Sequence, residues 1–222
     1  MGKLDIMLEG GGSASVSLTP YDKMQKLHLT TSSLGELLQS VGIYEHATGG
    51  YASIEAERRI DAYGRPDSEG FKGALTGNNV RVVNAPALAK ILSLTSFIGM
   101  VDTLRGKGIL FDGVKGSFRL HNGALNFSDA VLKGAGFGIV FKGDMDCYKC
   151  EHKLNGSVIP MYAFNTMLSK VPVVGKIISG TKNESGLFAV SFVAEGDKQD
   201  SLVKVNPLTA FTPGIIQDVM TN

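Results

Sequence analysis

The sequence lacks the charge imbalance that is typical of nucleic-acid-binding proteins. Its 22 Lys and Arg residues nearly balance its 21 Asp and Glu residues, which leaves a formal net charge of +1. No cluster of Lys and Arg resembles a surface that follows a phosphate backbone. We therefore expect no nucleic-acid partner.

Recognisable catalytic and metal-binding motifs are also lacking. There is no H-E-x-x-H pair, the glycines before Ser13 do not form G-x-S-x-G, and Gly175–Ile177 lacks the rest of a phosphate loop. The four histidines are scattered along strand-like or loop-like segments, at positions 28, 46, 121 and 152. We therefore expect no enzyme activity, no cofactor and no metal site.

Cysteine is scarce, and the two residues present, Cys147 and Cys150, form a single C-Y-K-C motif. A lone C-x-x-C can be a redox pair, half of a zinc site or an incidental pair in a turn. No second pair completes a zinc site, and the motif lies in a predicted hairpin turn, Asp146 to His152, where no helix dipole would stabilise a thiolate. A structural or incidental role is favoured, and an oxidising compartment would permit a disulfide across the turn.

No long hydrophobic run is present that would clearly span a bilayer. The most apolar stretch, 85–101, contains Lys90 and is short of the ~20 apolar residues that a spanning helix needs. It fits better a helix that packs on a sheet or lies against a membrane surface. The N-terminus shows no signal peptide, which indicates either a cytoplasmic chain or a piece of a longer exported protein.

What the sequence does contain is alternation of apolar and polar residues, which predicts a mainly β fold of half-buried antiparallel strands. With 43% hydrophobic and 19% charged residues the chain should fold, and its 28 glycines suit turns and bulges between many short strands. Asn122-Gly123 predicts the tight turn of a hairpin. The residues expected on one face are Phe118, Leu120, Leu125 and Phe127 in this hairpin, Phe137, Ile139 and Phe141 in the next strand, and Phe188, Val190 and Phe192 further on.

Helices are expected at 32–42, 85–105 and 161–180, the last broken at Pro172. In the longest, Asn84 would be the N-cap and Gly106 the stop signal. Its apolar stripe consists of Leu88, Ile91, Leu94, Ile98 and Val101. The strands are expected at 1–30, 50–83, 108–159 and 186–205, before a tail at 206–222, all in a single domain.

Four segments, in order, give the sequence a resemblance to a known family. They are Ser40–Glu57 ("SVGIYEHATGGYASIEAE"), Phe71–Asp146, Gly156–Gly180 ("GSVIPMYAFNTMLSKVPVVGKIISG") and Val203–Ile216 ("VKVNPLTAFTPGII"). Together they resemble the C-terminal region of the bacterial AsmA-like family, which includes envelope proteins of the YhdP and TamB type. The chain is far shorter than those proteins, lacks their N-terminal membrane anchor, and has C-Y-K-C in place of a polar turn.

The resemblance implies an antiparallel sheet curled into a U-shaped trough, with an apolar concave face and a polar convex face, interspersed with a few amphipathic helices. It implies a periplasmic segment of an inner-membrane-anchored bridge that conducts phospholipid to the outer membrane. The ten alternating residues above would line the groove, and the stripe of helix 85–105 would gate it or contact a membrane. Two alternatives remain: the helix simply covers the sheet, or the domain docks an outer-membrane partner and Leu88, Ile91, Phe97 and Met167 fill its groove.

Overall fold

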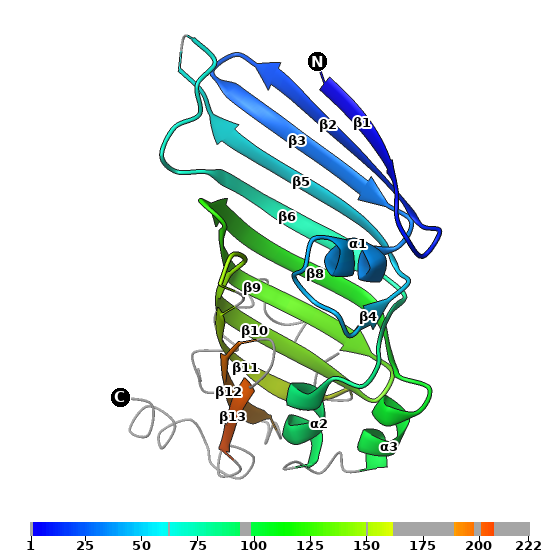
Figure 1. Cartoon of the computed structure of the whole chain (residues 1–222). Coiled ribbons are helices and arrows are strands. Elements are labelled where there is room, and N and C mark those ends of the chain that lie inside the picture. The colour runs from blue at the N-terminus through cyan, green and yellow to red at the C-terminus, as the bar shows by residue number, and fades with distance from the viewer. Residues whose placement is uncertain are drawn as a thin grey trace.

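The protein is mainly β, as the alternation predicts. The structure is a computed structural model that describes residues 2–61, 63–93, 99–149, 151–161, 189–197 and 201–206. Within these ranges, thirteen strands form one sheet and three short helices accompany it (Figure 1).

The sheet is antiparallel at every pairing, and its main path follows the chain. Eleven strands lie in the order β1-β2-β3-β5-β6-β8-β9-β10-β11-β12-β13, and the short β4 and β7 pair beside them. The bounds are β1 Gly2–Met7, β2 Ser13–Tyr21, β3 Met24–Thr31, β4 Ala47–Thr48, β5 Tyr51–Arg59, β6 Phe71–Asn78, β7 Val80–Val82, β8 Ile109–His121, β9 Ala124–Gly134, β10 Phe137–Asp146, β11 Glu151–Pro160, β12 Val190–Gly196 and β13 Ser201–Asn206.

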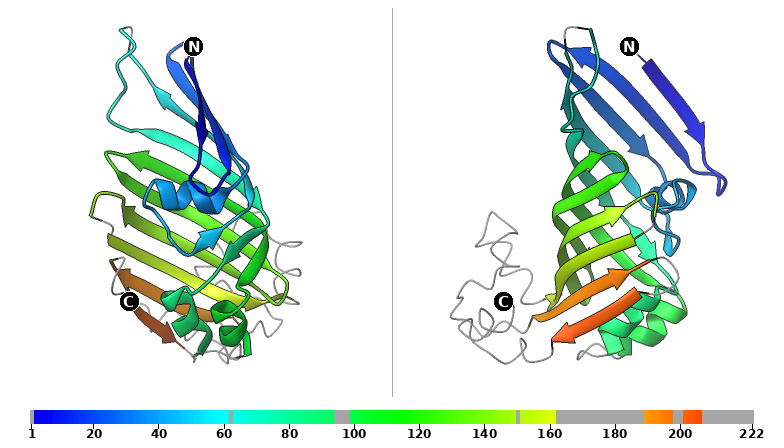
Figure 2. Two further views of the ribbon diagram at one scale, coloured as in Figure 1. Left: turned by 45° about the vertical axis from the view of Figure 1, so that its right-hand side comes forward. Right: turned by 60° about the vertical axis from the view of Figure 1, so that its left-hand side comes forward.

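The hairpin predicted at Asn122-Gly123 is confirmed and joins β8 to β9. Both residues have positive φ angles, 47° and 76°, as a two-residue turn of the right twist requires. Register then follows from the turn, with His121 opposite Ala124 and Leu120 opposite Leu125. Bulges interrupt this register at Ser117/Phe118 and, between β9 and β10, at Phe141/Gly143. Such bulges increase the local twist, which Figure 2 shows along the whole sheet.

Cross-strand partners share a face, so the registers trace rows of side chains across the sheet. We call one face the apolar face, because three consecutive rows on it consist almost wholly of apolar residues and glycine. From β2 onward, the rows are Ala14-Thr31-Ala52-Gly77-Val114-Leu132-Ile139-Val158-Val190, Val16-Leu29-Ile54-Leu75-Gly116-Ala130-Phe141-Gly156-Phe192-Val205, and Leu18-Leu27-Ala56-Gly73-Phe118-Phe127-Gly143-Leu154-Ala194-Val203.

The opposite face is largely polar, with side chains such as His28, Glu55 and Lys115. It has an apolar exception at one end of β10 and β11, where Val140 and Ile159 are fully buried. The second face is therefore not uniformly polar.

The three helices, α1 Leu34–Ser40, α2 Pro86–Ser93 and α3 Gly99–Arg105, lie on the apolar face (Figure 2). The predicted helix at 32–42 is confirmed as α1: Ser33 is its N-cap, and the Ser33 hydroxyl accepts a hydrogen bond from the Glu36 amide at 3.4 Å. No helix in the described part of the chain is long and apolar enough to cross a membrane.

The prediction of one helix over 85–105 is wrong, because its two ends meet. The Asn84 amide donates a hydrogen bond to the Leu104 carbonyl at 3.1 Å. In one straight helix these residues would stand about 30 Å apart. Two short helices, α2 and α3, are present instead, with 94–98 outside the described residues.

The ends of these helices only partly match the predicted signals. Asn84 is not the N-cap: its φ is 51°, and the Ala85 carbonyl accepts the first helical bond, from the Ala89 amide. Gly106 does follow the last helical residue, Arg105, as predicted. The helical region predicted at 161–180 lies outside the described residues except for Met161.

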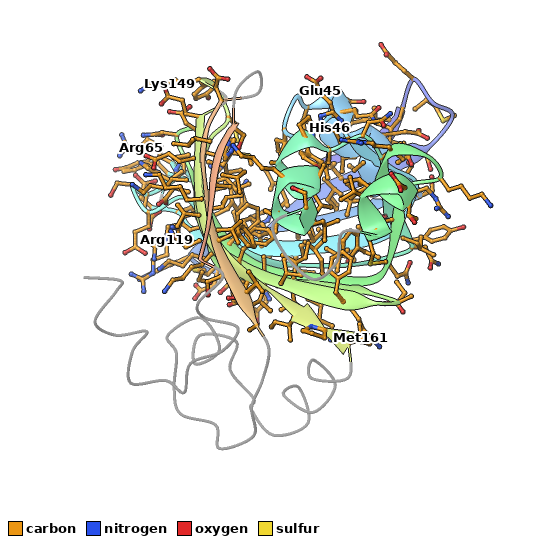
Figure 3. The ribbon with its side chains drawn as sticks, turned by 90° about the horizontal axis from the view of Figure 1, so that it is seen from below. Glu45, His46, Arg65, Arg119, Lys149 and Met161 are labelled. Carbon is orange, nitrogen blue, oxygen red and sulfur yellow. The ribbon has the colours of Figure 1, made fainter. Side chains whose placement is uncertain are left out.

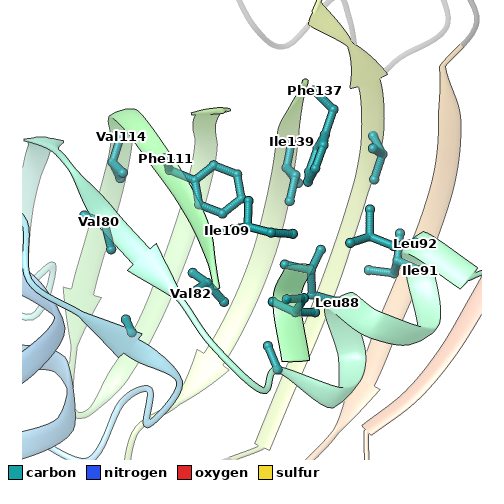
Figure 4. Packing of buried hydrophobic residues seen from close by; sticks show 14 of the residues in the cluster. Val80, Val82, Leu88, Ile91, Leu92, Ile109, Phe111, Val114, Phe137 and Ile139 are labelled. Carbon is teal, nitrogen blue, oxygen red and sulfur yellow. The ribbon is translucent and has the colours of Figure 1, made fainter. Parts of the chain in front are cut away.

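The core lies between α2, α3 and the strands from β8 to β13 on the apolar face (Figure 4). Leu92 of α2, Leu104 of α3, Phe111 of β8 and Phe137 of β10 are all fully buried there. The rings of Phe111 and Phe137 meet edge to face, with centroids 6.0 Å apart. The helices thus cover one end of the apolar face.

Candidate functional site: the apolar face beyond the helices

The predicted groove-lining residues share one face of the sheet. Registers place Phe118 and Leu120 of β8, Leu125 and Phe127 of β9, Phe137, Ile139 and Phe141 of β10, and Val190 and Phe192 of β12 on the apolar face. Phe188 lies outside the described residues. The alternation therefore predicts the shared face correctly for the nine described residues, while their role in binding lipid stays a prediction.

These residues differ sharply in exposure, and the helices explain the difference. Phe137, Ile139 and Phe192 are buried within the core that α2 and α3 complete. Phe118 is only half-buried, and Leu120 keeps 37% of its surface exposed.

We call the partly exposed segment the open region. It comprises Leu18, Leu27, Phe71, Phe118, Leu120, Leu125 and Phe127. A face that continues from a closed core into an exposed apolar surface is unusual, because sheets normally bury such a face.

Glycine shapes the apolar face where large rings need room. Gly156 lies between Phe141 and Phe192 in one row. A Cβ atom at Gly156 would stand 2.6 Å from the Phe192 ring, a distance at which the ring would have to move. Phe141 in turn meets Phe127 edge to face, with ring centroids 5.7 Å apart. The absence of a side chain at Gly156 therefore provides the space that the Phe192 ring occupies.

The helical stripe belongs to the core. Leu88, Ile91 and Val101 keep 9%, 4% and 8% of their surface exposed and pack against the sheet. A surface that contacts a membrane would leave such side chains exposed, so the described side chains favour the simple covering role. Leu94, Ile98, Phe97 and Met167 lie outside the described residues.

The rim of the open region carries a polar group that the sequence analysis missed. Arg58 is on the apolar face, directly opposite Gln25 across β3 and β5. Its Nε donates a hydrogen bond to Gln25 Oε1 at 2.8 Å, and its guanidinium lies 4.5 Å from the centroid of the Phe71 ring. In β5, every second residue (Ala52, Ile54 and Ala56) lies on the apolar face, and Arg58 follows with the same spacing. This spacing was the sequence signal that could have placed Arg58 on that face.

His152 lies further along the same rim, on β11. Its Nε2 is 3.0 Å from Ser201 Oγ of β13. Burial lowers the pKa of His152 below its ordinary value, and the nearby charge of Asp197 opposes that shift. The histidine therefore tends to stay neutral near pH 7.

Cys147–Lys149, the first three residues of the C-Y-K-C motif, lie in a turn between β10 and β11, as predicted. Asp146 Oδ1 accepts hydrogen bonds from the Tyr148 and Lys149 amides, both at 2.9 Å, and the pKa of this carboxyl is lowered chiefly by the Lys149 bond. The Cys147 amide donates to the Gly123 carbonyl at 2.8 Å. Cys150 lies outside the described residues, so the predicted disulfide is not tested.

No other cluster in the described ranges offers a stronger site. They contain no group of three or more His, Cys, Asp or Glu residues that could hold a metal ion. A shallow hollow between Asp5 of β1 and Tyr51 of β5 is lined mainly by short side chains such as Ala14 and Ser15.

Comparison with known proteins adds no assignment. No model of a protein family matches the chain, and neither a curated protein nor a solved structure matches it. The resemblance to the AsmA-like family therefore stays a prediction from the sequence. What the described residues offer is a partly exposed apolar surface with Arg58 and His152 at its rim.

Proposed function

We propose that this chain is a non-enzymatic segment of a lipid conduit, in which alkyl chains lie along the apolar face. The observation that carries the proposal is the unbroken apolar face, which runs across all eleven strands of the main path and leaves its open region uncovered by the helices. The open region extends from β2 to β9, and with a strand spacing of about 4.8 Å these five intervals make a path roughly 24 Å long.

Physical chemistry favours an alkyl chain as the occupant. Each CH₂ group removed from water contributes about 0.8 kcal/mol, and this gain has no preferred direction. A lipid tail can then move from one row to the next without breaking a specific hydrogen bond. In this proposal the sheet forms a U-shaped trough, and its twist and bulges are the features that would curl it.

The wider context is proposed on the sequence resemblance alone. In it, the chain is the C-terminal part of an inner-membrane-anchored protein in the bacterial periplasm. That protein carries phospholipid to the outer membrane and so contributes to outer-membrane biogenesis.

A second candidate function is a docking module that binds an outer-membrane partner and carries no lipid. The burial of Leu88 and Ile91 favours it, because these side chains occupy one end of the apolar face. The half-buried state of Phe118 and Phe127 opposes it, since a filled groove would bury them as well.

Mass spectrometry of lipid extracted from the full chain, purified from a bacterial host, tests the two candidates. We expect phospholipid with the native chain and strongly reduced lipid with Phe118→Asp, which places a charge in the open region. Arg119→Asp is the matched control, because the next residue of the same strand lies on the opposite face; Figure 3 shows Arg119 on the far side of the sheet from the helices.

Thermal unfolding accompanies the lipid measurement, so that a loss of lipid is not confused with a loss of fold. A folded native chain without lipid would reject the conduit and support the docking module. Equal loss of lipid in Phe118→Asp and Arg119→Asp would also argue against a site on the apolar face.

A further inference from the structure

We infer that Arg58 is a headgroup site, which binds the phosphate of an amphiphile whose alkyl chain lies in the open region. This inference rests on the proposed function and adds the residue that binds the phosphate of the ligand. The inference starts from an exception to the pattern of the sheet. Among the paired residues of the described strands, Arg58 is the only charged residue (Asp, Glu, Lys or Arg) that the register places on the apolar face.

The guanidinium of Arg58 is held in place by two contacts that leave its outer nitrogens available. Gln25 Oε1 accepts a hydrogen bond from Nε at 2.8 Å, and the Phe71 ring lies 4.5 Å below the guanidinium carbon. These contacts fix the plane of the group through one N–H of five. The two terminal nitrogens, with four N–H donors, form the fork that matches a phosphate.

The positive charge of Arg58 has no carboxylate partner within 4.0 Å in the described ranges, whereas the ion pairs found there join other residues. The neighbouring Arg59 differs, because it lies on the polar face and its charge acts on Glu69. The pKa of Glu69 is lowered first by the Lys72 hydrogen bond and charge, and then by Arg59 and Arg119. The charges of Arg59 and Arg119 thus act on a carboxylate near the polar face, whereas no ion pair found in the described ranges includes Arg58.

The position of Arg58 suits both parts of an amphiphile, the phosphate and the alkyl chain. Phe71 is opposite Leu120 of β8, and Leu120 is opposite Leu125 of β9, so the open region begins directly beside the guanidinium. In the next row, Leu27, Ala56 and Gly73 continue the apolar surface away from the rim. A phosphate at Arg58, which is half-buried, would therefore have an apolar path for its tail.

Binding of two amphiphiles with the same tail tests this inference. The probes are dodecyl phosphate and dodecyl maltoside, each added below its micelle concentration to the full chain and measured by calorimetry, with inorganic phosphate as a third ligand. A charged hydrogen-bonded contact is expected to make dodecyl phosphate bind about tenfold or more tightly than dodecyl maltoside. Salt should reduce this advantage, because the site is partly exposed to solvent.

Two neighbouring arginines supply the variant and its control. Arg58→Gln should abolish the advantage of dodecyl phosphate and leave dodecyl maltoside unchanged, while Arg59→Gln should behave like the native chain. Arg58→Met is the second variant, because it keeps an apolar stem over Phe71 and removes the guanidinium, with both its charge and its hydrogen bond to Gln25. Thermal unfolding establishes that each variant is folded.

The outcomes separate this inference from the proposed function. A native chain that binds neither amphiphile contradicts the lipid conduit itself. Equal binding of both amphiphiles, or an equal loss in Arg58→Gln and Arg59→Gln, overturns the headgroup site and leaves the conduit standing. Inorganic phosphate that binds as tightly as dodecyl phosphate would make Arg58 an ion site and would also overturn the inference.

Discussion

For a single side chain in this protein, the face of the sheet and the row within it decide the environment. Phe118 and Arg119 are neighbours in β8, yet one lies on the apolar face and the other on the polar face. His152 illustrates the consequence for chemistry: its register places it at the rim of the apolar face, where burial disfavours the charged imidazolium.

His152 should make the free energy of unfolding depend on pH. Because its pKa is lowered in the folded state, the unfolded chain binds a proton first as the pH falls through about 6.5. Stability is therefore expected to fall below that pH. Thermal unfolding at about pH 7.5 and about pH 5.5 measures this fall in stability, and His152→Gln should lose less stability between the two pH values than the native chain does.

His28→Gln is the control for this measurement, because His28 is exposed on the polar face. If His28→Gln reduced the acid-side loss as much as His152→Gln, burial of His152 would not be its cause.

At the scale of elements, α2 and α3 cover one end of the apolar face with side chains that are part of the core. α2 and α3 run back on each other, as the bond from Asn84 to Leu104 shows, and their apolar sides join one core cluster, α2 mainly against β13 and α3 against β8. Helices this short are marginal on their own, so their burial against the sheet stabilises them.

Leu92 gives a direct measure of that packing. Its side chain is fully buried under α2, so Leu92→Ala removes contacts and leaves a cavity. We expect the free energy of unfolding to fall by about 2–5 kcal/mol, as measured by chemical denaturation. Lys90→Ala, on the exposed side of the same helix, should change it by less than about 0.5 kcal/mol. Equal small changes in both variants would mean that α2 contributes little to the core.

At the scale of the whole molecule, stability should be unevenly distributed along the sheet. β1 pairs with β2 on one side, and every residue in it is exposed, including Leu4 at 60%. β10 has neighbours on both sides and contains Phe137 and Val140, which are fully buried. Local opening of β1 therefore requires far less free energy than opening of β10.

Hydrogen exchange followed by mass spectrometry tests this distribution. Amides of β1 should exchange roughly a hundredfold faster or more than amides of β10 under native conditions. Protection of β1 equal to that of β10 would contradict the prediction and would indicate that the sheet opens as one unit.

The strands and their faces were readable from the sequence because the underlying signals are local. Side chains alternate with a period of two residues, so Phe118, Leu120, Leu125 and Phe127 share a face once Asn122-Gly123 sets the turn. The start of α1 was readable for the same reason, because Ser33 caps the helix through a residue three positions away.

The tertiary structure decided which parts of that face are covered, because coverage depends on residues far apart in the chain. Phe137 and Phe118 follow the same alternation, yet only Phe137 lies in the cluster that contains both Leu92 of α2 and Val203 of β13. Two further features also depend on contacts between segments that no local pattern connects. They are the break between α2 and α3, where Asn84 bonds to Leu104, and the hydrogen bond of Arg58 to Gln25. The sequence by itself determined an amphipathic antiparallel sheet, and long-range packing determined where its apolar face stays open.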